Sequence, residues 1–136
     1  MQFTEYHKYD ATGLAELVAK GEVTADELLD TALAGVDAVN GQLNAVVATF
    51  EDEARRFIRD DLGQGPFKGV PFLLKDLTAH YGGQPTGAGW PPRAAVRPEH
   101  DAELVRRFKK AGVVIVGKTA VPELAMDWTT RSRAHG

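Results

Sequence analysis

The sequence predicts an α/β fold with parallel strand pairing. Apolar residues recur at helical spacing in several segments, and three short runs between them are apolar throughout, at residues 45–48, 70–74 and 113–116. Such runs are typical of strands that are covered on both faces, as in parallel sheets. Glycine and proline concentrate between these segments, at residues 63–66 and 78–100. An alternation of helices with fully apolar strands is typical of α/β architecture.

Two helices are predicted near the N-terminus. In residues 11–20 the leucines share one helix face, Asp10 is placed to cap the first turn, and Gly21 is placed to end the last turn. Thr24 and Glu27 form a capping box, in which each side chain satisfies a free backbone N–H group of the other residue. The sequence therefore predicts a second helix that starts directly after Thr24.

The second helix is expected to end near Asn40 and Gly41, where a glycine follows a residue that readily leaves helical geometry. After a short buried strand, residues 51–61 are strongly charged. We predict that they form a solvated helix, which Phe57 and Ile58 anchor to the core.

The second half of the chain is predicted to hold a long loop and two further helices. Residues 78–100 are irregular, and loops of this length in a compact domain are usually functional or mobile. Asp101 is placed to cap a helix, and Pro122 suits the first turn of a short helix that reaches Met126. The side chains that the helix after Asp101 is expected to bury are Leu104, Val105 and Phe108.

Composition excludes several classes of function. The 136 residues carry a net charge of −3, which is too weak to indicate nucleic acid or a membrane surface as a partner. There are no cysteines, so disulfides and cysteine nucleophiles are excluded. Residues 1–8 lack the apolar core of a signal peptide, and no apolar run is long enough to span a membrane. These features predict a cytoplasmic globular protein.

Lys75 directly follows the apolar run 70–74, so it is expected at the C-terminal end of a buried strand. Ligands collect at that end of the strands in open α/β sheets. Burial penalises an ammonium group, which makes a neutral amine and hence a general base accessible near neutral pH. Asp76 leaves two alternatives: a carboxylate that pairs with Lys75 would hold it charged, whereas one turned away would not. A solvated Lys–Asp pair with no catalytic role remains the alternative from spacing alone.

Several motifs resemble those of the amidase-signature family, in order and over almost the whole chain. Residues 65–76 (GPFKGVPFLLKD) are similar to the family's lysine motif. Residues 101–108 (DAELVRRF) and 111–119 (AGVVIVGKT), followed by Pro-Glu, resemble its next block. The N-terminal helical pair, with residues 38–45, is similar too.

The resemblance implies hydrolysis of non-peptide or small linear amides by a serine–serine–lysine triad, without a metal or organic cofactor. Lys75 matches the lysine, which accepts a proton from a bridging serine that activates the nucleophilic serine. The implied fold has helices around a mixed, largely parallel β-sheet. Residues 1–136 would be the N-terminal segment of a single amidase domain. Within that segment, residues 1–62 would be a mainly helical lead-in and residues 63–136 the start of the catalytic core.

The departures from the family pattern concern the serines. Ser132 is the only serine, and it lies among charged residues without flanking glycines, so no triad role is assigned to it. The bridging and nucleophilic serines are expected beyond residue 136, and the isolated chain is expected to be inactive. Trp90 stands where the family often has a serine, which leaves the substrate class open. The alternative is a non-catalytic interaction module that pairs with a partner chain or with itself, as a homo-oligomer.

Three other patterns point to different chemistry but have simpler explanations. Residues 112–119 match the phosphate-binding P-loop letter by letter, yet the residues between the glycines are four β-branched apolar ones, as in a strand. Nucleotide binding is therefore not expected. The four histidines, at positions 7, 80, 100 and 135, lack metal-ligand spacing. The arginines and lysines of residues 93–110 are interrupted by glutamates, so a solvated face is expected there.

Overall fold

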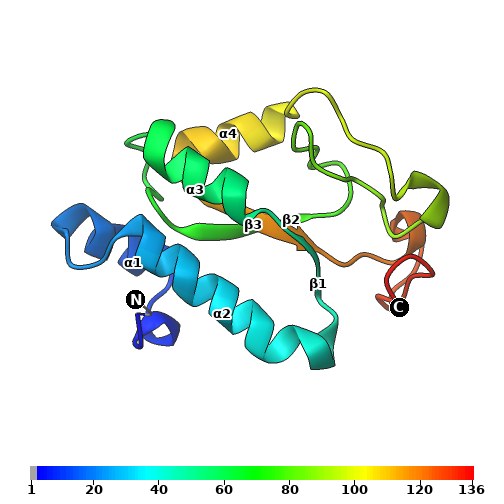
Figure 1. Ribbon diagram of the computed structural model, residues 1–136, viewed down its shortest axis with the longest axis horizontal. Coiled ribbons are helices and arrows are strands. Elements are labelled where there is room, and N and C mark those ends of the chain that lie inside the picture. Colours follow the sequence, from blue (N-terminus) through cyan, green and yellow to red (C-terminus); the bar gives the residue numbers. More distant parts are fainter. Residues whose placement is uncertain (1–2) are drawn as a thin grey trace.

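The computed structural model describes residues 3–136 and confirms the α/β class (Figure 1). In chain order the elements are η1 (Tyr6–Lys8), α1 (Ala11–Lys20), α2 (Ala25–Leu43), β1 (Val46–Thr49), α3 (Glu51–Asp60), β2 (Pro71–Lys75), η2 (Pro91–Arg93), α4 (Glu103–Ala111), β3 (Val114–Thr119) and η3 (Glu123–Ala125), where η denotes a 3₁₀ helix. None of the helices in this described part combines the length and the apolar character that crossing a bilayer requires.

The three strands form one mixed sheet in the order β1-β3-β2. β3 pairs in parallel with β2 and antiparallel with β1. The parallel pairing predicted from the apolar runs therefore holds for β2 and β3 but not for β1, and the mixed sheet that the family resemblance implies is confirmed. The parallel register places Leu74 opposite Lys118, and Lys75 opposite Thr119. These pairs bring the strand end that carries Lys75 beside the end of β3.

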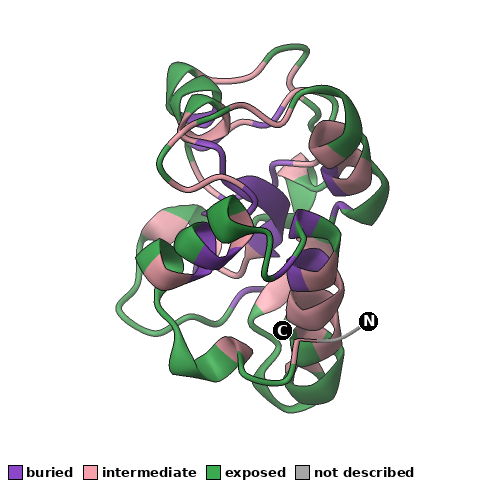
Figure 2. Cartoon of the chain, turned by 90° about the vertical axis from the view of Figure 1, so that its left-hand side faces the viewer, coloured by how far each residue is buried: buried purple, intermediate pink, exposed green. Residues whose placement is uncertain are grey.

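Helices cover both faces of the central strand. Val114 and Val116 pack with Leu29 of α2 and Ala54 of α3, whereas Ile115 packs with Val105 of α4 on the other face. Figure 1 shows the strands between α2 and α4, and Figure 2 shows the buried residues gathered at the centre of the molecule. β3 is buried almost throughout, as predicted. β2 is covered on both faces but less completely: its first three residues are half-buried, Leu74 is buried and Lys75 is exposed, so the predicted burial holds only in part for this strand.

The predicted caps of the first two helices are confirmed. Asp10 accepts a hydrogen bond from the Gly13 backbone N–H at 2.8 Å, and Gly21 ends α1 with a φ of 72°. That left-handed conformation favours glycine, because a Cβ would clash with the following carbonyl. Thr24 and Glu27 exchange both bonds of the capping box. Local side-chain chemistry therefore defines these helix ends without help from the rest of the fold.

Two helices, α2 and η3, extend differently from the predictions. α2 continues through Gly41 to Leu43 and ends at Asn44, whose φ is 48°. Asparagine also tolerates the left-handed conformation, so it replaces the predicted glycine stop. Pro122 caps only η3, because Leu124 has a φ of 53° and cannot continue an α-helix.

Asp101 does not cap α4, which begins after Ala102 without a side-chain cap. One Asp101 oxygen accepts from the Gly82 backbone N–H at 2.8 Å, and the other pairs with Lys109 Nζ at 2.6 Å. The carboxylate therefore ties the long loop to the helix. Val105 is fully buried and Phe108 half-buried as predicted, but Leu104 is 46% exposed, so its predicted burial is wrong in the described chain.

Tyr81 anchors the start of the long loop in the core. Its ring packs edge-on against Phe50, with centroids 5.6 Å apart, and Lys109 Nζ lies 4.1 Å from its centroid on the ring face. Burial raises the pKa of Tyr81 to about 12, and the negative charge of Asp101 adds to the shift. The folded chain therefore holds the phenolic proton more tightly than the unfolded chain.

This shift predicts how stability changes in alkaline solution. A tyrosine whose pKa is raised on folding stabilises the folded state below its ordinary pKa of 10.0, and this contribution is lost as pH rises towards about 12. We expect the free energy of unfolding to fall by ~2 kcal/mol more in the wild type than in Tyr81→Phe over this range. Urea denaturation at both ends of the range measures the difference. Phenylalanine keeps the ring contacts, so equal losses in the two proteins would contradict the prediction.

Candidate functional site

Lys75 is the last residue of β2, at the strand end where the sequence places it. The backbone on both sides of it is held by β3. Asp76 N–H donates to the carbonyl of Thr119 at 3.2 Å, and the Thr119 hydroxyl donates to the carbonyl of Leu74 at 3.3 Å. The position of the Lys75 Cα is therefore set by the sheet, while its side chain leaves the sheet.

The side chain of Lys75 is exposed. Among residues 3–136 its amine makes no hydrogen bond or ion pair. The burial that was expected to favour the neutral amine is therefore absent from the described residues.

Asp76 answers the alternative that the sequence left open, because its carboxylate turns away from Lys75. The carboxylate is buried and accepts a hydrogen bond from the Gly87 backbone N–H at 3.1 Å. It also lies 3.5 Å from Lys118 Nζ, an ion pair with both side chains almost fully buried. The Asp76 carbonyl accepts from Ala88 N–H at 3.0 Å. All of these bonds direct Asp76 into the loop rather than towards Lys75.

Lys118 is the buried lysine of this fold, with 1% of the residue exposed. It extends from β3 and also donates a hydrogen bond to the hydroxyl of Thr86, which is itself buried. Burial lowers the pKa of Lys118 from its ordinary value, and the Asp76 carboxylate opposes that shift. We call Asp76, Thr86 and Lys118 the buried polar cluster.

Sequence reasoning missed this cluster. Lys118 was placed in a family motif and in a P-loop pattern but was given no role of its own, and the structure shows why the P-loop pattern is misleading. Gly112 ends α4, and Gly117, Lys118 and Thr119 lie within β3. A lysine inside a central strand is buried, whereas a P-loop lysine lies on a loop that can approach phosphate. No local sequence signal reveals the cluster, because it depends on the pairing register, which puts Lys118 opposite Leu74.

Ser132 makes no hydrogen bond with Lys75 among the described residues. It is buried, its hydroxyl accepts from the His135 backbone N–H at 3.1 Å, and its backbone bonds Gly136 in both directions. Every hydrogen bond of Ser132 within the described residues therefore lies in the same terminal turn. Trp90 follows the loop glycines and is exposed. Among residues 3–136, no group of three or more His, Asp or Glu side chains is arranged to hold a metal ion.

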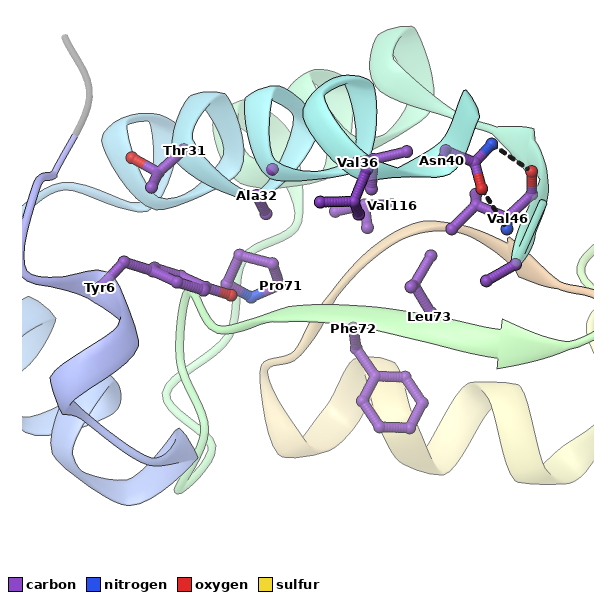
Figure 3. A pocket seen from close by; sticks show the side chains of 13 residues that line it. Tyr6, Thr31, Ala32, Val36, Asn40, Val46, Pro71, Phe72, Leu73 and Val116 are labelled. Atoms are coloured by element: carbon purple, nitrogen blue, oxygen red, sulfur yellow. Dashed lines mark hydrogen bonds between the residues drawn. The ribbon is translucent and has the colours of Figure 1, made fainter. Parts of the chain in front are cut away.

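A separate hollow of about 410 Å³ lies between α2 and β2 (Figure 3). Its walls are mostly apolar and include Val36, Leu73 and Val116. At one end the Asn40 amide both donates to and accepts from the backbone of Val46, at 2.9 and 2.8 Å. Lys75 does not line this hollow, so it and the lysine site are different features.

The lysine site offers one amine on a rigid strand end, with the adjacent carboxylate already paired to another cation. Such an amine can accept a proton from a donor that a further segment brings to it. Within the described residues, no hydroxyl group makes a hydrogen bond with this amine.

In a comparison with known protein families, the family described as Amidase matches residues 27–136 of this chain. The chain belongs to the amidase family, and this confirms the resemblance seen in its motifs.

Among known proteins, the chain is 43% identical over 129 residues to the 6-aminohexanoate-cyclic-dimer hydrolase of Paenarthrobacter ureafaciens, covering 93% of this chain and 26% of that protein. It superposes on a structure of 6-aminohexanoate cyclic dimer hydrolase complexed with substrate, with a TM-score of 0.89 and 40% identity, covering 98% of this chain and 27% of that one. A bacterial aryl acylamidase of the amidase-signature family matches with a TM-score of 0.80 and 26% identity over 90% of this chain and 27% of its own. The chain therefore spans about a quarter of the length of these relatives.

Proposed function

We propose that Lys75 is the general base of an amide hydrolase to which residues 1–136 contribute the N-terminal segment of the catalytic domain. The observation that carries the proposal is the placement of Lys75. Its amine leaves the C-terminal end of β2, and the neighbouring Asp76 carboxylate is engaged by Lys118. Residues 1–62 would then be the lead-in and residues 63–136 the start of the catalytic core.

In the proposed reaction the Lys75 amine accepts a proton from a bridging serine, which in turn takes the proton of the nucleophilic serine. The serine oxygen attacks the amide carbonyl, the C–N bond breaks, and the nitrogen leaves with a proton as an amine. Water then hydrolyses the acyl-serine ester and releases a carboxylic acid. Both serines would come from outside residues 1–136, since the chain's one serine, Ser132, is bonded within its own turn.

We propose a small non-peptide carboxamide as substrate. The 43% identity to a 6-aminohexanoate-cyclic-dimer hydrolase supports a compact aliphatic amide, and makes the cyclic dimer the first compound to assay. Ring opening of that diamide by water would expose one primary amine, which amine-reactive dyes detect directly.

The division of the triad makes a prediction for the isolated chain. We expect purified residues 1–136 to release amine from the cyclic dimer no faster than buffer without protein does. A base without a nucleophile cannot form the acyl intermediate. A longer protein that continues this chain to the full length of its relatives serves as the positive control. Turnover by residues 1–136 alone would overturn the proposed division.

A second candidate function is a non-catalytic interaction module that pairs with a partner chain or with a second copy. The observation in its favour is apolar surface near the C-terminus, where Met126 and Trp128 are almost entirely exposed. Size-exclusion chromatography with light scattering separates the two candidates. A defined dimer of residues 1–136 would support the module, and a well-folded monomer would contradict self-association.

A further inference from the structure

The buried polar cluster is not used by the proposed reaction, yet it lies directly behind the proposed base. Lys118 and Asp76 have side chains exposed by only 1% and 4%. Thr86, the third member, is equally buried and accepts a hydrogen bond from Lys118 Nζ. A buried ion pair of this kind contributes little net stability, because desolvation of both charges offsets their attraction. Its presence therefore calls for a reason other than stability.

The cluster links β3 and the long loop to the residue that follows Lys75. Lys118 belongs to β3 and lies opposite Leu74 in the parallel register. Thr86 belongs to the long loop, where its backbone N–H donates to Val96 at 2.9 Å. Asp76 connects strand and loop, because its carboxylate accepts from Gly87 N–H and its carbonyl accepts from Ala88 N–H. Lys118 thus holds the loop and the residue after Lys75 in one arrangement.

The charge of Lys118 has a second consequence. Asp76 is the neighbour of Lys75 in sequence, and a carboxylate that paired with the Lys75 amine would hold that amine protonated. In the structure the carboxylate is instead satisfied from inside, by one ammonium and one backbone N–H group. Without Lys118, an unpaired carboxylate would be left buried, which is strongly unfavourable. The neighbour of Asp76 in sequence, Lys75, carries a cation with which the released carboxylate could pair.

We propose that Lys118 is a positioning residue for Lys75: it occupies the Asp76 carboxylate inside the loop and so keeps that carboxylate from pairing with the Lys75 amine. The importance of this for catalysis rests on the proposed function, in which Lys75 is the base. The arrangement of charges itself is a property of residues 1–136 and can be measured without any turnover.

The test measures the reactivity of the Lys75 amine in the 136-residue chain. Limiting acetic anhydride acetylates only neutral amines, and peptide mass spectrometry gives the labelling rate of Lys75 relative to the exposed Lys20 of α1. In Lys118→Met we expect the relative rate at Lys75 to fall about fivefold, because the released Asp76 carboxylate holds the amine charged. In the double variant Lys118→Met/Asp76→Asn we expect the wild-type rate, because no carboxylate is left to pair.

Two results would overturn the proposal: an unchanged rate in a folded Lys118→Met variant, or a reduced rate that Asp76→Asn does not rescue. A purely structural role of Lys118 would give no such rescue. If Lys118→Met alone does not fold, the labelling rate of Lys75 in the single variant Asp76→Asn tests the proposal instead. Its amide oxygen can still accept from Gly87 and Lys118, and the proposal requires an unchanged Lys75 rate. A faster rate would mean that Asp76 already acts on Lys75 and would refute the proposal.

This readout separates the two levels of inference. Rescue in the labelling experiment together with a fully active Lys75→Ala enzyme would keep the role of Lys118 in arranging charge and reject Lys75 as the base. No effect on labelling together with an inactive Lys75→Ala enzyme would do the opposite.

Discussion

Replacing Lys75 by alanine in a longer amidase that contains this chain is expected to lower kcat about 10³-fold, with a much smaller change in KM. A general base contributes roughly 10²–10⁴ in rate, and members of a catalytic triad act as a unit. The effect on folding should be small, because the Lys75 side chain is exposed and makes no hydrogen bond or ion pair within residues 3–136. Steady-state kinetics on the cyclic dimer, with melting curves of both proteins, measure the two quantities.

Two further variants sharpen this experiment. Lys75→Arg keeps the positive charge but cannot accept a proton near neutral pH, so we expect it to be as inactive as the alanine variant. Activity in the arginine variant would show that the charge of Lys75 matters rather than its basicity. Lys20→Ala removes an exposed lysine of α1 and should leave kcat unchanged. A near-wild-type rate for Lys75→Ala would remove Lys75 from the reaction.

The second large effect is expected at Gly117, in the middle of β3. A Cβ at this position would lie 2.2 Å from the carbonyl oxygen of Ala48 in β1, and 3.3 Å from a methyl group of Leu73 in β2. The first of these atoms belongs to the backbone, so relief requires β1 to move away from the central strand. We expect Gly117→Ala to reduce the free energy of unfolding by ~3 kcal/mol, as overpacking of a core does.

Gly35→Ala provides the matched control for that measurement. Gly35 lies within α2, and a Cβ there would meet no atom within 4 Å. Alanine favours a helix interior over glycine, so this variant should gain ~0.5–1 kcal/mol. Urea denaturation of the wild type and the two variants should show that the same change, glycine to alanine, lowers the free energy of unfolding at Gly117 and raises it at Gly35. A neutral Gly117→Ala variant would contradict the close approach of β1 and β3.

The helix ends that depend on local chemistry could be predicted from the sequence. Asp10 and the pair Thr24–Glu27 act on backbone groups three residues away, so their role is visible in the order of residues alone. Asp101 has the same kind of pattern but a different role, because Gly82 and Lys109 offer its carboxylate better partners. Those partners become neighbours only once the loop and α4 are packed.

The candidate site also has one part that the sequence could predict and one part that it could not. The position of Lys75 at a strand end follows from the apolar run before it, and the structure confirms it. The role of Lys118 depends on its contacts with Asp76 and Thr86, which lie 42 and 32 residues away in the sequence. Local pattern cannot reveal such contacts, because they arise from the register between β2 and β3. The sequence therefore predicted the position of Lys75, which is exposed, and missed the role of Lys118, which is buried.

The strand order has a consequence for synthesis on the ribosome. β3 is central in the sheet, yet it is the last of the three described strands along the chain. β1 and β2 therefore emerge with no partner available, and they stay unpaired until residue 119 has left the exit tunnel. Helices α1 and α2 carry their own caps and can form while translation continues. A nascent chain stalled before residue 114 would expose both apolar strands at once, which makes that stage of translation the one most in need of a chaperone.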